Sequence, residues 1–256
     1  MTENESSGGT DAAEQRDVED DDLAASLQGL SVLSAGRLPL EEMLTRVARY
    51  AVQAIPGADG AGLTLIEQHR ADTLVTTATF VAEVDAVQYN LGEGPCISAA
   101  RDGVTMTSGS LGGDARWPRF GGRIARLGVH SALSLPLLTP EGVVGAMNIY
   151  ARAKNAFDKR AAELGELFAV PAAISVQNAQ ALEETRRLAG RLQTALDERM
   201  IIERAIGVVM SRSGVDEREA LARLTTLSQR EHVKLVQVAR TLVDEAVRRA
   251  RATPRD

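Results

Sequence analysis

The side chains that could carry out chemistry are few and widely spaced. The 256-residue chain has one cysteine, Cys96, and three histidines, so neither a disulfide framework nor a multi-cysteine zinc site can form. Cys96 could be a nucleophile, a redox sensor or a cofactor attachment point if a neighbouring base or helix N-terminus lowered the pKa of its thiol. We favour the simpler interpretation of a small buried residue, because free cysteines are commonly buried.

The sequence lacks the motifs of the large enzyme classes. No G-x-x-x-x-G-K-[ST] phosphate loop occurs, and the kinase His-Arg-Asp and Asp-Phe-Gly motifs are missing. Residues 91–96, Leu-Gly-Glu-Gly-Pro-Cys, resemble a dinucleotide loop only superficially, because Pro95 stands where that pattern continues. We therefore predict that the chain is not an enzyme.

Residues 116–120, Arg-Trp-Pro-Arg-Phe, form an aromatic cluster. Trp117 and Phe120 could anchor the core beside an irregular loop, or they could form the wall of a pocket. If the chain binds a small ligand, our candidate pocket residues are Cys96, Trp117 and Phe120. The sequence indicates no particular cofactor and no metal site.

Charge is distributed unevenly along the chain. The 29 Lys and Arg against 35 Asp and Glu give a net charge of −6, which by itself argues against a nucleic-acid partner. Residues 1–22 hold nine acids and one arginine, net −8, whereas residues 191–256 hold thirteen bases and ten acids, net +3. We therefore keep nucleic acid as a candidate partner of the C-terminal quarter. With only eight aromatic residues, a base-stacking platform is not expected.

The elements that would position these residues follow an acidic N-terminal segment. Residues 1–22 lack large apolar side chains except Val18, and this composition predicts a disordered tail. Apolar residues at three- and four-residue steps predict helices over 23–35 and 40–55. The start does not read as a signal peptide and no membrane-spanning apolar run occurs, so we expect a cytoplasmic protein with no membrane partner.

Four alternating, β-branched segments predict strands in two pairs joined by short turns: 61–67, 72–80, 131–138 and 143–150. Short turns favour an antiparallel sheet with helices on one side, so the predicted fold class of residues 23–178 is α+β. The stretch 81–130 is long, glycine-rich and irregular, and long loops of this kind are usually functional.

The remainder of the chain is predicted to be helical. Asp158 can cap a helix with the apolar positions Ala161, Leu164, Leu167 and Phe168. Near-heptad leucines over 179–196 predict a connecting helix that forms a coiled coil with a second copy; the alternative is a helix docked on the preceding domain. Three short helices then form an all-α bundle over 197–250, with a break at Gly214 and a cap at Asp216.

Several segments resemble the GAF domains of actinobacterial GAF-ANTAR regulators: 91–96, 99–103, 116–120, 127–131 and 145–150. The C-terminal segments that resemble an ANTAR domain are 195–199, 202–210, 219–220, 227–229 and 234–239. The two resemblances together cover about residues 38 to 250, in the order of that family.

The resemblance implies a GAF sensor with a six-stranded antiparallel sheet, able to hold a small-molecule ligand that the sequence does not identify. It further implies a dimeric three-helix ANTAR module that binds paired stem-loops in leader transcripts and prevents a terminator from forming. The predicted divisions are a tail, the GAF domain, a connecting helix, the ANTAR domain and a second tail: 1–22, 23–178, 179–196, 197–250 and 251–256.

Six residues are the expected RNA contacts. Four match the family pattern or remain compatible with it, and two arginines would bind phosphates: Arg199, Arg204, Ser228 and Lys234, with Arg212 and Arg230. Four positions depart from the pattern and are expected to weaken the basic surface: Ile206, Thr225, His232 and Val233. The alternative function is therefore a GAF sensor that signals through protein partners, with the ANTAR helices reduced to a dimerisation element.

Overall fold

A computed structural model of the chain describes residues 7–35, 38–67 and 70–252. The chain divides into two compact units, Met1–Glu183 and Glu184–Asp256. The first unit combines helices with a β-sheet, and the second is entirely helical over the residues described.

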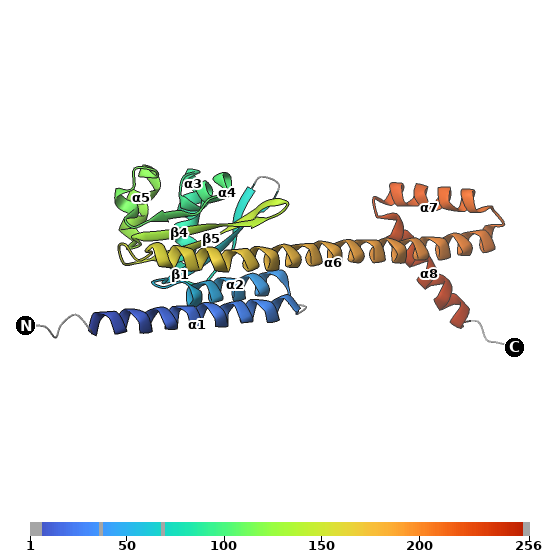
Figure 1. The fold of residues 1–256 in the computed structure, drawn as a ribbon. Coiled ribbons are helices and arrows are strands. Elements are labelled where there is room, and N and C mark those ends of the chain that lie inside the picture. Colours follow the sequence, from blue (N-terminus) through green and yellow to red (C-terminus); the bar gives the residue numbers. More distant parts are fainter. Residues whose placement is uncertain (1–6, 36–37, 68–69, 253–256) are drawn as a thin grey trace, which may run out of the picture. The chain divides into compact units, whose positions relative to one another are not determined.

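The first unit is built on a five-stranded antiparallel sheet with the order β2-β1-β5-β4-β3 (Figure 1). The strands are β1 Gly60–Glu67, β2 Arg70–Thr76, β3 Met106–Ser108, β4 Ser131–Thr139 and β5 Gly142–Ala151. The four predicted strands are confirmed, although β2 ends at Thr76 rather than at residue 80. The described residues form five strands where the resemblance implied six, and β3 was not predicted.

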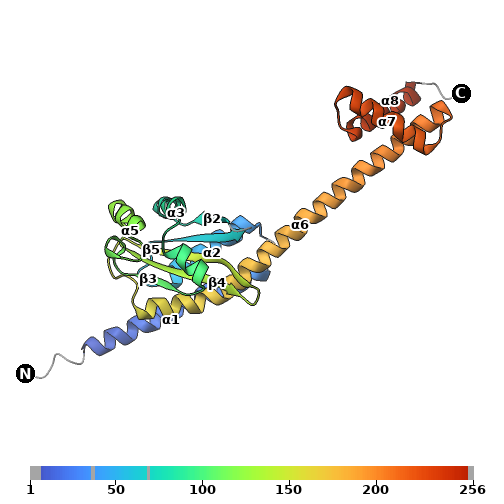
Figure 2. The ribbon, with the colours of Figure 1, turned by 90° about the horizontal axis from the view of Figure 1, so that it is seen from above.

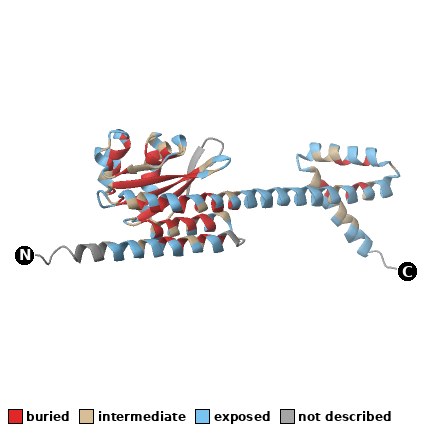
Figure 3. Cartoon of the chain, in the orientation of Figure 1, coloured by how far each residue is buried: buried red, intermediate tan, exposed pale blue. Residues whose placement is uncertain are grey.

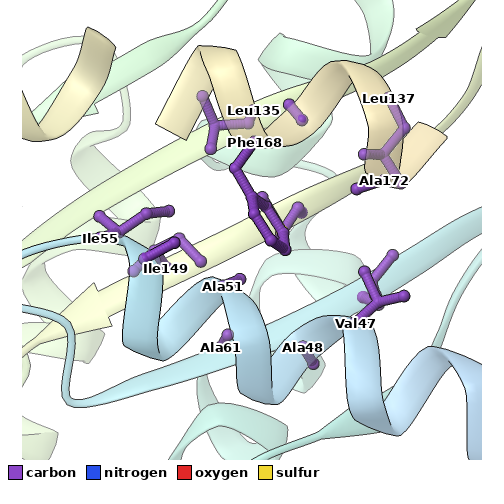
Figure 4. Packing of buried hydrophobic residues seen from close by; sticks show 14 of the residues in the cluster. Val47, Ala48, Ala51, Ile55, Ala61, Leu135, Leu137, Ile149, Phe168 and Ala172 are labelled. Atoms are coloured by element: carbon purple, nitrogen blue, oxygen red, sulfur yellow. The ribbon is translucent and has the colours of Figure 1, made fainter. Parts of the chain in front are cut away.

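One face of the sheet packs against α2 (Leu40–Ala54) and the first turns of α6 (Lys159–Ser213). Alternate strand residues such as Leu135 and Ile149 point to this side and are fully buried. Figure 4 shows the ring of Phe168 directed from α6 toward α2, within the same apolar cluster. Burial of such a side chain contributes about 2 to 3 kcal/mol, so this layer is a main source of stability.

The opposite face is covered by α3 (Thr79–Leu91), α4 (Pro95–Asp102) and α5 (Pro118–Ile124), and Figure 2 looks onto it from their side. Helices therefore cover both faces, and the prediction of helices on one side is wrong. The stretch 81–130, predicted to be irregular, contains these helices together with the 3-10 turns Leu111–Gly113 and Ala125–Leu127. Several of its glycines end helices in the left-handed conformation: Gly92, Gly103 and Gly128.

Helix α1 (Ser7–Ala35) corrects the predicted disordered tail. Residues 7–22 are its first turns, whereas 1–6 lie outside the described residues. Two acidic side chains of this segment are held by Arg160 of α6, which pairs with Asp20 and lies 3.8 Å from a carboxylate oxygen of Glu19. The predicted helix from Leu23 onward is confirmed, with buried leucines at 23, 30 and 33.

Helix α6 is a single 55-residue helix. The predicted cap is confirmed, because Oδ1 of Asp158 accepts a 2.8 Å hydrogen bond from the amide of Ala161. Three of the four apolar positions named for this helix, Ala161, Leu164 and Phe168, are buried, whereas Leu167 is 59% exposed. Pro171 lies inside the helix, and the hydroxyl of Ser175 donates to its carbonyl at 2.9 Å. Residues 181–200 are all exposed (Figure 3).

The second unit contains the end of α6, α7 (Glu217–Glu231) and α8 (Leu235–Ala252). The predicted three-helix bundle is confirmed. Gly214 follows α6 with φ of +66°, and Oδ1 of Asp216 accepts from the amide of Glu219 at 2.8 Å, as predicted. The buried core is small and consists of Ala205, Ile206, Ala220, Leu224, Val238 and Ala239.

Candidate ligand and nucleic-acid sites

A buried polar cluster lies between the sheet and α3. The hydroxyl of Tyr150 donates to Oδ1 of Asp85 at 2.7 Å, and the amide nitrogen of Asn148 donates to the same oxygen at 3.3 Å. The hydroxyl of Ser134 donates to Oδ1 of Asn148 at 3.0 Å. Burial, followed by the charge of Asp85, raises the pKa of Tyr150 well above its usual value. The cluster thus places a carboxylate and a neutral phenol in an enclosed site.

Cys96 lies at the edge of this cluster, in the first turn of α4. Its sulfur is 3.7 Å from both the Thr64 and the Tyr89 hydroxyl oxygens, and its amide donates to Oε1 of Gln88 at 2.9 Å. Burial, and next the charge of Asp85, raises the pKa of the thiol to about 11. The interpretation of Cys96 as a buried residue is confirmed. A nucleophile or redox sensor needs a lowered thiol pKa, and the pKa of Cys96 is raised instead.

Two glycines in β1 allow α3 to approach the sheet closely. A Cβ at Gly60 would lie 2.7 Å from Cγ2 of Val81, and a Cβ at Gly62 would lie 2.5 Å from Oδ2 of Asp85. The side chains of α3 therefore occupy the space directly above β1. The buried Nε2 atom of Gln88, also on α3, has no hydrogen-bond partner among the described residues. This nitrogen is a donor that a polar ligand could satisfy.

The structure separates the three candidate pocket residues. Phe120 is fully buried in the core beneath α5, and Cys96 points into the polar cluster. Trp117 instead lines a surface cavity of about 350 Å³, and its indole nitrogen donates to the hydroxyl of Ser98 at 2.9 Å. Of the three, Trp117 alone lines this cavity.

Charged side chains shape the wall of that cavity. The guanidinium of Arg116 lies 4.3 Å from the centre of the Trp117 ring and also donates to the carbonyl of Thr107 at 2.6 Å. Its hydrogen bonds to Asp114 lower the pKa of that carboxyl to about 2. Oε1 of Glu93 accepts from the amide of Arg119 at 2.7 Å and so caps α5. The cavity wall therefore combines the Trp117 ring with two arginines, Arg101 and Arg116, and two acids, Glu93 and Asp102.

The six predicted RNA contacts lie in the second unit. Arg204, Arg212 and Lys234 are exposed and make no ion pair among the described residues. Arg199 pairs with Glu203 at 2.7 Å and Arg230 with Glu231 at 3.4 Å. Exposed ion pairs of this kind are worth at most about 1 kcal/mol, so both arginines can exchange their partners for a phosphate.

The turn between α7 and α8 brings Ser228, Arg230 and Lys234 into one short segment. The hydroxyl of Ser228 donates to the carbonyl of Val233 at 2.6 Å, and the amide of Val233 donates back to the carbonyl of Ser228 at 3.2 Å. His232 lies in the left-handed region, with φ of +55°. This is the Schellman pattern of helix termination. Ser228 therefore stabilises the turn and keeps only acceptor capacity for a ligand.

The departures from the family pattern have structural explanations. Ile206 belongs to the bundle core and is 6% exposed, so the apolar side chain at this position serves the packing of the helices. His232 stands at a left-handed position, where asparagine is more easily accommodated, so this change concerns the backbone. The hydroxyl of Thr225 donates to the carbonyl of Leu221 at 2.9 Å. Val233 is 38% exposed.

The polar cluster is not among the sites predicted from the sequence. Asp85 and Gln88 lie three residues apart on α3, within the stretch predicted to be irregular, and only a helix brings them to one face. Asn148 and Tyr150 alternate with apolar residues along β5, which places both on the same face. Within the described residues, no group of His, Cys, Asp and Glu side chains could hold a metal ion. None of the described helices has the length and hydropathy to cross a membrane.

Two protein-family models match the chain. The GAF-domain model matches residues 37–177 and the ANTAR-domain model matches residues 190–243. Their order is the one predicted from the sequence. The search of curated proteins finds no matching relative.

Solved structures give weaker similarities. A GAF domain is 16% identical at a TM-score of 0.49, covering 61% of this chain and 88% of its own. A GAF domain of an Acinetobacter phosphoenolpyruvate-protein phosphotransferase is 13% identical at 0.48, covering 63% and 93%. The type II free methionine-R-sulfoxide reductase of Thermoplasma acidophilum is 18% identical at 0.44, covering 54% and 92%. At these values the similarities carry no argument about activity.

Proposed function

Because the chain belongs to the GAF-ANTAR family, with a GAF domain followed by an ANTAR domain, we propose that it is a cytoplasmic transcription antiterminator. Both domains are regulatory. In this proposal the GAF domain receives a signal, and the ANTAR bundle binds stem-loops in nascent transcripts.

The exposed cations of the ANTAR bundle carry this proposal. The apolar face of each helix is used by the small core, so the remaining faces present Arg204, Arg212 and Lys234 to solvent. Cations without acid partners can bind phosphates and release counterions. Residues 197–250 contain no aromatic residue, so stacking on bases is not available to the bundle. It would instead bind the phosphates of the RNA backbone and place polar side chains against bases that extend from a hairpin loop.

A second copy of the chain supplies the other part of the proposal. Leu188, Leu192 and Leu196 lie on α6 at four-residue steps and are 55%, 59% and 58% exposed. Pairing this seam with its counterpart would bury the leucines in a coiled coil. A homodimer would carry two basic bundles and therefore suit tandem stem-loops.

The signal is proposed to be a small molecule that binds the GAF domain. The cavity beside Trp117 has a volume of about 350 Å³, within the range of small-ligand pockets. Both of its arginines, Arg101 and Arg116, are already paired with acids, and the stacked Arg116 and Trp117 side chains favour a ligand with a planar aromatic group.

RNA binding by the second unit tests the proposal. Gel-shift titration of fragment 184–256 with a tandem-hairpin RNA should show binding that weakens steeply as salt is added. Arg204→Gln with Lys234→Gln should weaken binding about tenfold or more, because two phosphate contacts are lost. The control is Arg223→Gln with Arg249→Gln, which removes the same charge from arginines already paired with Glu219 and Glu245. Absent or salt-insensitive binding would contradict the proposal.

The alternative is a GAF sensor that acts through protein partners, with the ANTAR helices serving for dimerisation. Two observations favour this alternative. The exposed leucines of α6 could form a dimer interface, and two of the candidate RNA contacts, Arg199 and Arg230, already have acid partners. It is favoured if the regulatory output survives Arg204→Gln with Lys234→Gln but is abolished by Leu192→Lys.

A further inference from the structure

Five exposed cations gather on the GAF domain, at some distance along the chain from the ANTAR helices. Arg119, Arg123 and Arg126 follow one another at steps of four and three residues along α5 and the 3-10 turn after it. This spacing puts them on one helical face about 10 Å long. The other two, Arg152 and Lys154, follow the end of β5. We call these five residues the arginine face.

The segment that carries Arg119, Arg123 and Arg126 and the segment that carries Arg152 and Lys154 lie side by side. A Cβ at Gly128, two residues after Arg126, would lie 3.6 Å from Nη1 of Arg152. The guanidinium of Arg152 also lies 4.8 Å from the centre of the Phe80 ring, which fixes its direction. The amide of His130 donates to the carbonyl of Ala151 at 2.9 Å, holding the two segments together.

The arginine face lacks compensating acids. Residues 115–157 contain six Lys and Arg residues but one acid, Glu141. In the described part of the chain, none of the five cations forms an ion pair, although eleven pairs form elsewhere.

Three carboxylates approach the edges of the face. Glu93 accepts from the amides of Arg119 and Phe120, and Asp59 accepts from the amide of Arg152 at 2.7 Å. Asp114 is engaged by Arg116. Because these acids are engaged by other groups, the guanidinium groups of the arginine face remain exposed without a charged partner.

We propose that the arginine face is a second RNA-binding surface, which contacts the phosphate backbone independently of the ANTAR helices. The inference rests on the proposed function, since the ANTAR domain would supply the RNA. Arginine presents a planar fork that matches a phosphate, and four of the five cations are arginines. The surface would therefore add affinity without reading sequence.

An acidic protein segment is the competing partner class. RNA is favoured because an ANTAR-bound transcript is a polyanion tethered to the same chain, which raises its effective concentration at the arginine face. The acidic turns of α1 are a weaker candidate, because Glu19 and Asp20 are already held by Arg160.

The test uses the full chain carrying Arg119→Gln, Arg123→Gln and Arg126→Gln. The matched control removes the same charge from cations that already have acid partners: Arg46→Gln, Lys159→Gln and Arg187→Gln. The probes are a tandem-hairpin RNA and a 30-nucleotide polyuridylate, titrated over a series of salt concentrations. Thermal unfolding confirms that both variants fold as the parent does.

We expect the arginine-face variant to bind both probes about tenfold more weakly or worse, and to reduce the slope of log K against log salt by about two to three. The control should bind within about twofold of the parent. Equal effects of the two variants, or no effect of the arginine-face variant, would overturn the inference. A changed oligomeric state with unchanged RNA affinity would also overturn it, in favour of a protein partner.

The same titration separates this inference from the proposed function. If Arg204→Gln with Lys234→Gln abolishes binding while the arginine-face variant binds normally, the inference fails and the proposed function stands. If the opposite result is found, the arginine face binds RNA and the assignment of RNA binding to the ANTAR helices fails.

Discussion

The hydroxyl of Tyr150 on β5 donates a 2.7 Å hydrogen bond to the carboxylate of Asp85 on α3, and both side chains are buried. This bond joins the sheet to the helix that covers it. Because the glycines of β1 let α3 lie close to the strands, the bond forms directly between protein groups. The polar cluster therefore contributes both to the stability of the GAF domain and to the position of α3.

Tyr150→Phe should destabilise the GAF domain by about 1 to 3 kcal/mol, because it leaves a buried carboxylate with one donor fewer. Urea unfolding followed by tryptophan fluorescence measures this domain selectively, since Trp117 is the single tryptophan of the chain. The control is Tyr50→Phe, at a half-buried position of α2 whose hydroxyl makes no hydrogen bond among the described residues. Equal midpoints for the two variants would show that the bond to Asp85 is not stabilising.

Cys96 should react slowly with thiol reagents in the folded protein. Burial raises the pKa of its thiol to about 11, so very little thiolate is present at pH 8. Labelling with a disulfide reagent should therefore be slow in the native state and fast in guanidinium chloride. Fast native labelling at pH 8 would contradict the structure.

The same pKa makes folding sensitive to high pH. The folded thiol keeps its proton where the unfolded thiol, with a pKa near 9, has lost it. The contribution of Cys96 to the free energy of unfolding is therefore complete below pH 9 and is lost as pH rises toward 11. Cys96→Ala should reduce the fall in urea midpoint across this window, compared with the parent chain.

His232→Gly should stabilise the turn between α7 and α8 by about 0.5 to 1 kcal/mol. The backbone there has φ of +55°, which glycine adopts without the Cβ strain that histidine pays. Hydrogen exchange measured by mass spectrometry should slow in peptides from α7 and α8. His232→Ala keeps a Cβ and should give no such slowing. Equal protection in the two variants would show that strain from the Cβ at this position does not destabilise the turn.

Leu188→Lys with Leu192→Lys should convert a dimer into a monomer. Both side chains are more than half exposed in the single chain, and a charge in a coiled-coil seam is costly to bury. Sedimentation measures the change. Arg186→Ala with Arg191→Ala is the control at exposed positions of the same helix. A parent chain that sediments as a monomer at all concentrations would contradict the predicted seam.

Local patterns predicted the regular parts of the fold well. The turn between β4 and β5 follows from Pro140 and Gly142, whose backbone preferences are strong, and β5 begins at this glycine. The caps at Asp158 and Asp216 also form as expected, because a cap depends on residues within three positions. Such features need no information from distant parts of the chain.

The candidate sites were harder to predict because they depend on contacts across the sequence. Asp85 and Tyr150 are 65 residues apart in the sequence, and no local pattern predicts the hydrogen bond between them. The helices of the 81–130 stretch are only seven to thirteen residues long, too short for a clear apolar period. Cys96 of α4 contacts Thr64 in the polar cluster, whereas Trp117 donates to Ser98 of the same helix and lines the surface cavity, and a linear motif cannot reveal this difference.

Pro171 allows the first turns of α6 to unwind separately from the rest of this long helix. A proline has no amide proton, so the carbonyl four residues earlier cannot receive its usual helical hydrogen bond. Unwinding that starts at Lys159 can therefore stop at this point while the later turns stay helical. The free energy needed to unwind only the turns before Pro171 is then set by four buried side chains, Ala161, Leu164, Phe168 and Ala169, rather than by all 55 residues.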